Sequence, residues 1–284
     1  MEAAAAGGRA LVVLPSRSPF QESRFAFPAR CAPIPIAQRH FFPPPRSWDS
    51  QCRRPLLRFS CCLREAQGDP ATRRKRLAVF VSGSGSNFRS IHKATIDGTV
   101  LGDVVIVVSD KPECKACEYA REHGISVAYY PRTKFAPDGV SPNELVEILR
   151  HQRVDFVLLA GYLKLIPKEL VEAFPRAILN IHPALLPAFG GKGFYGIKVH
   201  EAVIASGARV SGPTIHFVDE KYDHGSILAQ RTVPVLETDT PQDLAARVLE
   251  QEHALYVEAV AALCEERIEW SGDGVPRMRE KELA

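Results

Sequence analysis

Short apolar runs alternate with longer amphipathic runs from residue 76 to residue 182, and this alternation constrains the fold more than any other feature. The short runs are rich in β-branched and aromatic residues, which favour strands, and the longer runs have helical spacing. The sequence therefore predicts an α/β, Rossmann-like fold with a largely parallel sheet flanked by helices. Strands are predicted at 76–82, 103–110, 126–131, 154–161 and 177–182, and helices at 87–98, 117–124, 141–152 and 165–175.

The pattern changes after residue 182. A short helix is predicted at 200–207, and two extended runs, 214–220 and 227–235, flank the turn KYDHGS and predict a C-terminal β-hairpin. A long amphipathic helix follows at 240–263, with Thr240 as its cap and Pro241 at its first position. No element is predicted beyond Glu266, and no internal repeat or second domain is apparent.

The N-terminal segment differs in composition from the rest. It is rich in arginine, poor in acids and interrupted by Pro43-Pro44-Pro45, which is typical of an organelle transit peptide; a plain disordered tail is the alternative. Its apolar run, residues 10–14, is too short for a secretory signal, and no run reaches the length of a membrane span. We predict a disordered transit peptide at 1–74, one folded domain at 75–268 and a tail at 269–284.

Charge and cysteine content narrow the class of protein. The formal net charge is +3, much of it from the leader, and gives no reason to expect nucleic acid as a partner. Of the 7 cysteines, Cys114, Cys117 and Cys264 follow the leader, too few for a disulfide framework. Cys114 and Cys117 have the C-x-x-C spacing of a redox pair, but two thiols in the first turn of an ordinary helix are the simpler interpretation.

A glycine-serine turn, SGSGSN (82–87), follows the first predicted strand and opens a helix. Backbone N–H groups at such a turn can hold an anion, helped by the helix dipole. The turn is not a Walker A loop, and it is only a partial dinucleotide fingerprint because Phe88 stands where a third glycine is expected. A phosphate monoester held by Gly85, Ser86 and Asn87 fits better; a turn that merely needs small residues is the alternative.

Asn180 and His182 stand at the end of the fifth predicted strand. Residues i and i+2 of a strand share a face, so the amide and the imidazole lie together at the carboxyl edge of the sheet, where sites form. A structural histidine remains the alternative. No nucleophile elbow and no metal-binding cluster is found in the sequence.

Asp223 lies in the predicted hairpin turn, and its importance depends on whether it reaches His182. A carboxylate beside an imidazole raises the imidazole pKa and favours the cation, and a cationic histidine beside an amide suits a developing oxyanion. This set contains no covalent nucleophile. It suits a reaction in which the substrate supplies the nucleophile, such as an amine that attacks a carbonyl.

Four motifs in this order, SGSGSN (82–87), NIHPALLP (180–187), SGPTIHFVDEKYDHGSILAQ (211–230) and QEHALY (251–256), resemble the phosphoribosylglycinamide formyltransferase family over residues 76–268. The resemblance implies formyl transfer from 10-formyltetrahydrofolate, as co-substrate and without a metal, to the amine of glycinamide ribonucleotide in purine biosynthesis. It also implies a plastid form located in the stroma, with the mitochondrion as an alternative destination. The expected partners are small molecules, with neither nucleic acid nor membrane, and the chain is expected to be a monomer or a homodimer.

The resemblance also assigns residues. Asn180, His182 and Asp223 carry over as catalytic residues. Residues implied for the ribonucleotide are Gly85, Ser86, Asn87, Leu249, Glu250, Gln251 and Glu252. Residues implied for the folate are Leu163, Lys164, Leu165, Ile166, Asn180, His216, Asp219, Glu220, Lys221, Tyr222 and Asp223.

The sequence departs from the family pattern in two loops. Residues 136–143 lack an arginine that the family often places there to contact the folate. Residues 188–196 are rich in glycine and predict a mobile lid, in which Lys192 meets a phosphate or the folate tail.

Three rival functions remain. A formyltetrahydrofolate deformylase shares the Asn, His and Asp set but is expected to carry an added N-terminal domain, for which the leader lacks the pattern. A methionyl-tRNA formyltransferase is expected to carry a basic C-terminal domain, which is not evident. A non-catalytic nucleotide-binding module would make Asn180 and His182 merely structural.

Overall fold

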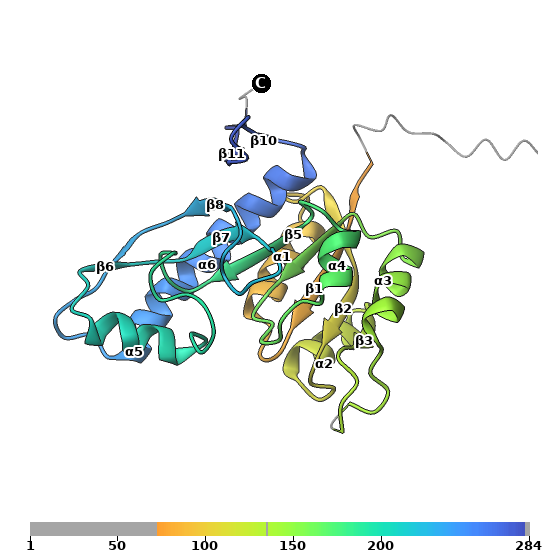
Figure 1. Cartoon of the computed structure of the whole chain (residues 1–284), viewed down its shortest axis with the longest axis horizontal. Coiled ribbons are helices and arrows are strands. Elements are labelled where there is room, and N and C mark those ends of the chain that lie inside the picture. Colours follow the sequence, from red (N-terminus) through yellow and green to blue (C-terminus); the bar gives the residue numbers. More distant parts are fainter. Residues whose placement is uncertain (1–72, 135, 282–284) are drawn as a thin grey trace, which may run out of the picture. The chain divides into compact units, whose positions relative to one another are not determined.

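The structure is a computed structural model that describes residues 73–134 and 136–281. Its centre is a sheet in the order β3-β2-β1-β4-β5-β7-β8 (Figure 1). The first five strands are parallel, and β7 and β8 add an antiparallel hairpin beside β5, which confirms the predicted fold class. The strands of this sheet are β1 (Lys75–Val81), β2 (Gly102–Ser109), β3 (Ser126–Tyr129), β4 (Phe156–Leu159), β5 (Ile178–His182), β7 (Thr214–Phe217) and β8 (Ile227–Gln230).

Helices cover both faces of the sheet. α1 (Ser86–Ile96), α2 (Lys115–Glu122) and α6 (Pro241–Cys264) share one apolar cluster with the sheet, and α3 (Pro142–His151) and α4 (Lys168–Ala173) share the other. Strand β1 alternates between the clusters, because Leu77 and Val79 face the first while Ala78 and Phe80 face the second. Burial on both faces explains why the strand reads as a continuous apolar run. α5 (Ile197–Ala205) packs against α6.

The strand order places a crevice between β1 and β4. The chain runs from β1 outward to β2 and β3, and then returns to place β4 and β5 on the other side of β1. The connections therefore leave β1 and β4 in opposite directions, and ligands bind in the crevice at such a switch point, outside the carboxyl ends of the strands.

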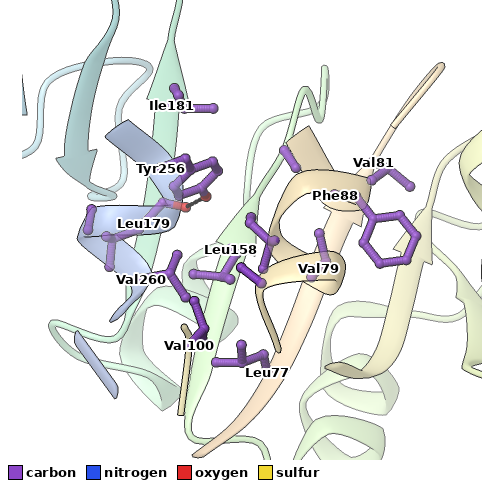
Figure 2. Close-up of a cluster of buried hydrophobic side chains, with 14 of the residues drawn as sticks. Leu77, Val79, Val81, Phe88, Val100, Leu158, Leu179, Ile181, Tyr256 and Val260 are labelled. Atoms are coloured by element: carbon purple, nitrogen blue, oxygen red, sulfur yellow. Dashed lines mark hydrogen bonds between the residues drawn. The ribbon is translucent and has the colours of Figure 1, made fainter. Parts of the chain in front are cut away.

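Tyr256 joins α6 to the ends of β4 and β5. Its ring is fully buried, and its hydroxyl lies 3.2 Å from the carbonyl oxygen of Leu179 (Figure 2). The same hydroxyl lies 3.1 Å from the carbonyl oxygen of Leu159. Burial raises the pKa of Tyr256 well above its ordinary value, so the hydroxyl keeps its proton and remains a donor. The tyrosine thus ties the long helix to the ends of β4 and β5.

Two predictions about the C-terminal half are wrong. Residues beyond Glu266 form a hairpin, β10 (Ile268–Trp270) and β11 (Pro276–Met278), whose Trp270 ring lies 4.7 Å from the ring of Phe217. Strands of three residues carry too little periodicity to be recognised in a sequence, and a tertiary contact holds this pair.

The run 227–235 is also not one strand. It divides into β8 and β9 (Val233–Pro234), and β9 pairs with β6 (Val210–Ser211) in a separate sheet. The chain passes Gly212 so closely that a Cβ there would lie 1.8 Å from the carbonyl oxygen of Arg231, a close approach that only glycine allows. The predicted transit peptide at 1–74 falls almost entirely outside the described residues, and the proposed domain division stays a prediction.

We predict that Tyr256→Phe lowers the free energy of unfolding by about 1–2 kcal/mol, because two buried carbonyl oxygens lose their shared donor. Urea unfolding followed by circular dichroism measures the change. Tyr195→Phe is the control, because Tyr195 is 47% exposed, and it should change stability by less than about 0.5 kcal/mol. Equal unfolding midpoints for Tyr256→Phe and the unmodified chain would show that the hydroxyl contributes nothing.

Candidate active site

A cavity of about 630 Å³ lies outside the carboxyl ends of β1, β4 and β5, where the strand order predicts a ligand site. The ends of these strands form its floor. The glycine-rich loop, the turn between β7 and β8, and the middle of α6 form its walls. The volume suits a small-molecule ligand of ordinary size.

Asn180 and His182 meet in this cavity at the end of β5, as the i, i+2 spacing predicts. Antiparallel pairing with β7 sets Asn180 opposite His216. The Nδ2 of Asn180 lies 3.0 Å from the Nε2 of His216 and 3.5 Å from the Oδ1 of Asp223. His216 Nδ1 lies 2.8 Å from the carbonyl oxygen of Phe217, and its Nε2 faces both the Asn180 amide and, at 3.6 Å, the Oδ1 of Asp223. His216 therefore fixes the orientation of the Asn180 side chain.

Asp223 does reach His182. Its Oδ2 lies 3.5 Å from the Nδ1 of His182 and accepts a hydrogen bond of 2.8 Å from the backbone N–H of Gly191. Burial acts to raise the pKa of Asp223, but the hydrogen bond with His216, the charge of His182 and the Gly191 N–H outweigh it and lower this pKa. The carboxylate is therefore charged at neutral pH, although its side chain is only 11% exposed.

The pKa of His182 is set by burial as well as by Asp223. Burial is the largest effect and lowers its pKa, while Asp223 and the Phe189 carbonyl act to raise it, and the net pKa lies below the ordinary value. Asp223 thus acts on the His182 pKa in the predicted direction, but burial outweighs it. A sequence can indicate which charged residue is a candidate neighbour of the imidazole. How deeply the imidazole is buried depends on packing that the sequence does not show.

Both ring nitrogens of His182 nevertheless face acceptors. Nε2 lies 2.8 Å from the carbonyl oxygen of Phe189, and Nδ1 faces Asp223. Either neutral tautomer therefore points a lone pair at an oxygen, whereas the cation satisfies both contacts. Burial opposes the cation and the two partners favour it, so small changes in the site move the proton readily.

The second end of the cavity is the turn that opens α1. Gly85 has φ 70°, and a Cβ there would lie 2.6 Å from the Cβ of Ala116, so the position requires glycine. Asn87 donates a hydrogen bond of 2.7 Å to the Oε2 of Glu252 on α6, and its own Oδ1 is buried without a partner among the described residues. Burial raises the pKa of Glu252, with Asn87 acting in the opposite direction.

Most residues assigned by the family resemblance line the cavity. Three of them do not: Glu220, Glu250 and Gln251. The lining includes these residues: Gly85, Ser86, Asn87, Leu163, Lys164, Leu165, Ile166, Asn180, His182, His216, Asp219, Lys221, Tyr222, Asp223, Leu249 and Glu252. Leu163 and Leu165 are each 45% exposed and offer an apolar surface to a ligand.

Sequence reasoning missed His200 and two backbone groups. His200, on α5, lines the cavity, and its Nδ1 is buried without a partner in the part of the chain that the structure describes. Burial, followed by the nearby His182, lowers its pKa. The sequence shows His200 only as the start of a predicted helix. The Phe189 carbonyl and the Gly191 N–H carry no side-chain signal, although their glycine-rich loop was singled out.

Within residues 73–134 and 136–281, no group of three or more His, Cys, Asp or Glu side chains is arranged to hold a metal ion. None of the helices in these same ranges is long and apolar enough to cross a membrane.

Comparison with known proteins identifies the family. Residues 75–260 match the formyl transferase family. The chain is 66% identical over 211 residues to a chloroplastic phosphoribosylglycinamide formyltransferase of Arabidopsis thaliana, covering 74% of this chain and 72% of that protein. The corresponding protein of Vigna unguiculata is 64% identical over 218 residues, covering 77% of this chain and 70% of the relative. The chain therefore belongs to the formyl transferase family.

Solved structures support the same family assignment. A glycinamide ribonucleotide transformylase of Symbiobacterium toebii matches with a TM-score of 0.64 and 36% identity, covering 73% of this chain and 95% of the other. The enzyme class expected from the sequence, a formyltransferase, is thus confirmed, and the names of the two plant relatives confirm the plastid assignment. A formyltetrahydrofolate deformylase of Pseudomonas syringae pv. tomato has a TM-score of 0.65 at 21% identity, covers 74% of this chain and 67% of that one, and shares the fold alone.

We predict that Glu252→Gln stabilises the fold at neutral pH. The folded-state pKa of Glu252 is raised by burial, so its charge costs stability as the pH rises from the unfolded pKa through the folded pKa. A glutamine mimics the protonated acid, so the gain should be small at about pH 4, below the ordinary pKa of glutamate, and larger at about pH 8. Urea midpoints at both pH values test this.

Glu250→Gln is the matched control, because Glu250 is exposed on the same helix and does not line the cavity. It should leave the unfolding midpoint almost unchanged at both pH values. A gain for Glu252→Gln of the same size at low and neutral pH would contradict the assigned pKa direction.

Proposed function

We propose that the chain transfers the formyl group of 10-formyltetrahydrofolate to the amine of N1-(5-phosphoribosyl)glycinamide, with Asn180, His182 and Asp223 as its catalytic residues. The products are the N-formyl ribonucleotide and tetrahydrofolate, in de novo purine biosynthesis. One observation carries the proposal: these three side chains converge in a cavity whose other end is the N-terminus of α1. The separation between the three side chains and the N-terminus of α1 suits a substrate with a reacting amine at one end and an anionic group at the other.

The ribonucleotide fits the α1 end of the cavity. Its phosphate would accept from the backbone N–H groups of Gly85, Ser86 and Asn87, which the helix dipole makes favourable. The unpartnered Oδ1 of Asn87 and the carboxylate of Glu252 are acceptors for hydroxyl or amide donors of the same substrate. Leu249 would provide a neighbouring apolar contact.

The folate fits between the strand ends and the hairpin turn. Leu163, Leu165 and Ile166 offer an apolar wall to the ring system, and residues 219–223 form the opposite wall. Lys164 and Lys221 also line the cavity and bring positive charge toward a folate carboxylate. The loop 136–143, where the family often places an arginine that contacts the folate, contributes no residue to the cavity lining. Glu220 also lies outside the lining.

The catalytic step needs a donor for the oxyanion that develops on the formyl oxygen and a carrier for the amine proton. One amide proton of Asn180 points to His216, and the other has only the long 3.5 Å contact with Asp223, so it is available to the formyl oxygen. His182 protonates readily once a negative charge develops nearby, and it can then pass a proton to the leaving folate nitrogen. Asp223 stabilises the imidazolium that this requires.

In the described conformation the carbonyl oxygen of Phe189 lies at hydrogen-bond distance, 2.8 Å, from Nε2 of His182. The ring can donate to a substrate through this nitrogen only when the carbonyl moves away. The proposed sequence of events therefore includes a shift of the loop 188–196 when the substrates bind.

A deformylase would use the same three side chains with water as the nucleophile. The two reactions differ in their need for the ribonucleotide. The full chain is mixed with 10-formyltetrahydrofolate, with and without the ribonucleotide, and tetrahydrofolate formation is followed. We expect turnover only with the ribonucleotide. Turnover that ignores it would identify a deformylase, and none in either mixture would support a non-catalytic binding module. The monomeric or dimeric state stays a prediction.

We predict that Asp223→Asn lowers kcat by about a hundredfold or more, since the imidazolium loses its neighbouring charge, while the KM for the ribonucleotide changes little. Steady-state kinetics measure both constants. Glu201→Gln is the control, because Glu201 is exposed on α5 and does not line the cavity, and it should behave as the unmodified chain. An unchanged kcat in Asp223→Asn would remove this carboxylate from the mechanism.

A further inference from the structure

Two thiols outside the active-site cavity lie close together at the start of α2. Cys114 is the N-cap of this helix, and Cys117 stands three residues further along. Their sulfur atoms are 3.5 Å apart, and both cysteines are free. Both cysteines are buried, but Cys114 keeps 9% of its surface exposed and Cys117 keeps none, so Cys114 lies nearer to the surface.

The surroundings of the pair give its members different properties. The hydrogen bond with Cys117 lowers the pKa of Cys114, and although burial acts to raise it, Ser109 and the backbone N–H groups of Ala116 and Cys117 add to the lowering. The contact with Cys114 raises the pKa of Cys117, and burial adds to this. The pair thus combines a favoured thiolate at a helix N-terminus with a more deeply buried thiol, the arrangement of a reactive dithiol.

We propose that Cys114 and Cys117 form a reversible redox site that exchanges with the disulfide of a thiol–disulfide oxidoreductase, and that its oxidation weakens binding of the ribonucleotide. In the first step the Cys114 thiolate attacks the partner's disulfide, forms a mixed disulfide and releases one partner thiolate. In the second step Cys117 loses its proton and attacks the Cys114 sulfur, and the second partner thiolate leaves. The chain loses two electrons and the Cys117 proton, and the partner's disulfide is reduced to two thiolates, which take up protons from solvent to become a dithiol.

The second step is helped by the first. While Cys114 is a thiolate, its hydrogen bond and its charge hold the proton on Cys117. Once the Cys114 sulfur is bonded to the partner, that charge is gone and Cys117 ionises more easily. The 3.5 Å between the two sulfurs must then shorten to about 2.05 Å, so the first turn of α2 has to adjust.

This turn is packed directly against the proposed phosphate loop. The N–H of Ala116, the residue before Cys117, donates a hydrogen bond of 3.2 Å to the carbonyl oxygen of Gly83. Ala116 is fully buried, and its Cβ fills the space that a side chain at Gly85 would need. A shift of Ala116 therefore has to move the loop or break its contact with Gly83. This coupling rests on the proposed function, which assigns the ribonucleotide phosphate to the loop.

The first arm of the test detects the disulfide itself. The full chain is equilibrated in glutathione buffers from reducing to oxidising, free thiols are blocked, and the protein is digested with trypsin without reduction. Trypsin cleaves after Lys115, between the two cysteines, so oxidation leaves peptides 94–115 and 116–121 joined. We expect the joined pair to form in oxidising buffer and to separate with dithiothreitol. If these peptides never appear joined, the redox site does not exist.

The second arm measures ribonucleotide binding by calorimetry, independently of turnover. Oxidation should weaken binding about tenfold, the effect of losing roughly one good hydrogen bond, and dithiothreitol should restore it. Cys117→Ser should bind equally well in both buffers, while Cys264→Ser, whose cysteine is buried at the end of α6, should respond as the unmodified chain does. A joined peptide pair with unchanged binding would refute the coupling. Absence of ribonucleotide binding even in the reduced chain would instead refute the proposed function.

Discussion

The buried carboxylate of Asp223 holds the candidate active site together. It lies within reach of Asn180 and His182 from β5, of His216 from β7 and of the Gly191 N–H from the glycine-rich loop. A charge on a side chain that is only 11% exposed is stable only when several donors surround it. The same donors therefore fix the position of the turn, the loop and the strand end relative to one another. Removing the carboxylate would leave each of these segments without a common partner.

The fold places these segments by a change in the sheet. The first five strands are parallel and connected through helices, but β7 enters antiparallel beside β5 (Figure 1). This pairing sets His216 against Asn180, and the short turn back to β8 returns Asp223 to the end of β5. Tyr256 secures the same strand end from the other side. The hairpin that follows the parallel sheet is thus what converts a general α/β crevice into this particular site.

The sequence predicted the parts of this site that depend on local periodicity. Strand and helix alternation gave the sheet, and the i, i+2 spacing of Asn180 and His182 put them on one face. Asp223 was a candidate only because of its turn, since its contact with His182 depends on the register of a hairpin distant in the chain. The net pKa of His182 could not be predicted for a similar reason, because burial is a property of the packed structure. His200 and the Phe189 carbonyl reach the site through loop and helix placement that no local pattern encodes.

The most direct test of the central claim, that Asp223 controls the proton of His182, is the pKa of this imidazole measured by nitrogen-15 NMR in the unmodified chain and in Asp223→Asn. The His182 signal is assigned with His182→Gln. In the unmodified chain we expect a pKa below the ordinary value of histidine, since burial is the larger effect. In Asp223→Asn we expect a further fall, because the neighbouring charge that favours the cation is gone. An equal pKa in both proteins would show that the carboxylate does not govern the proton of His182.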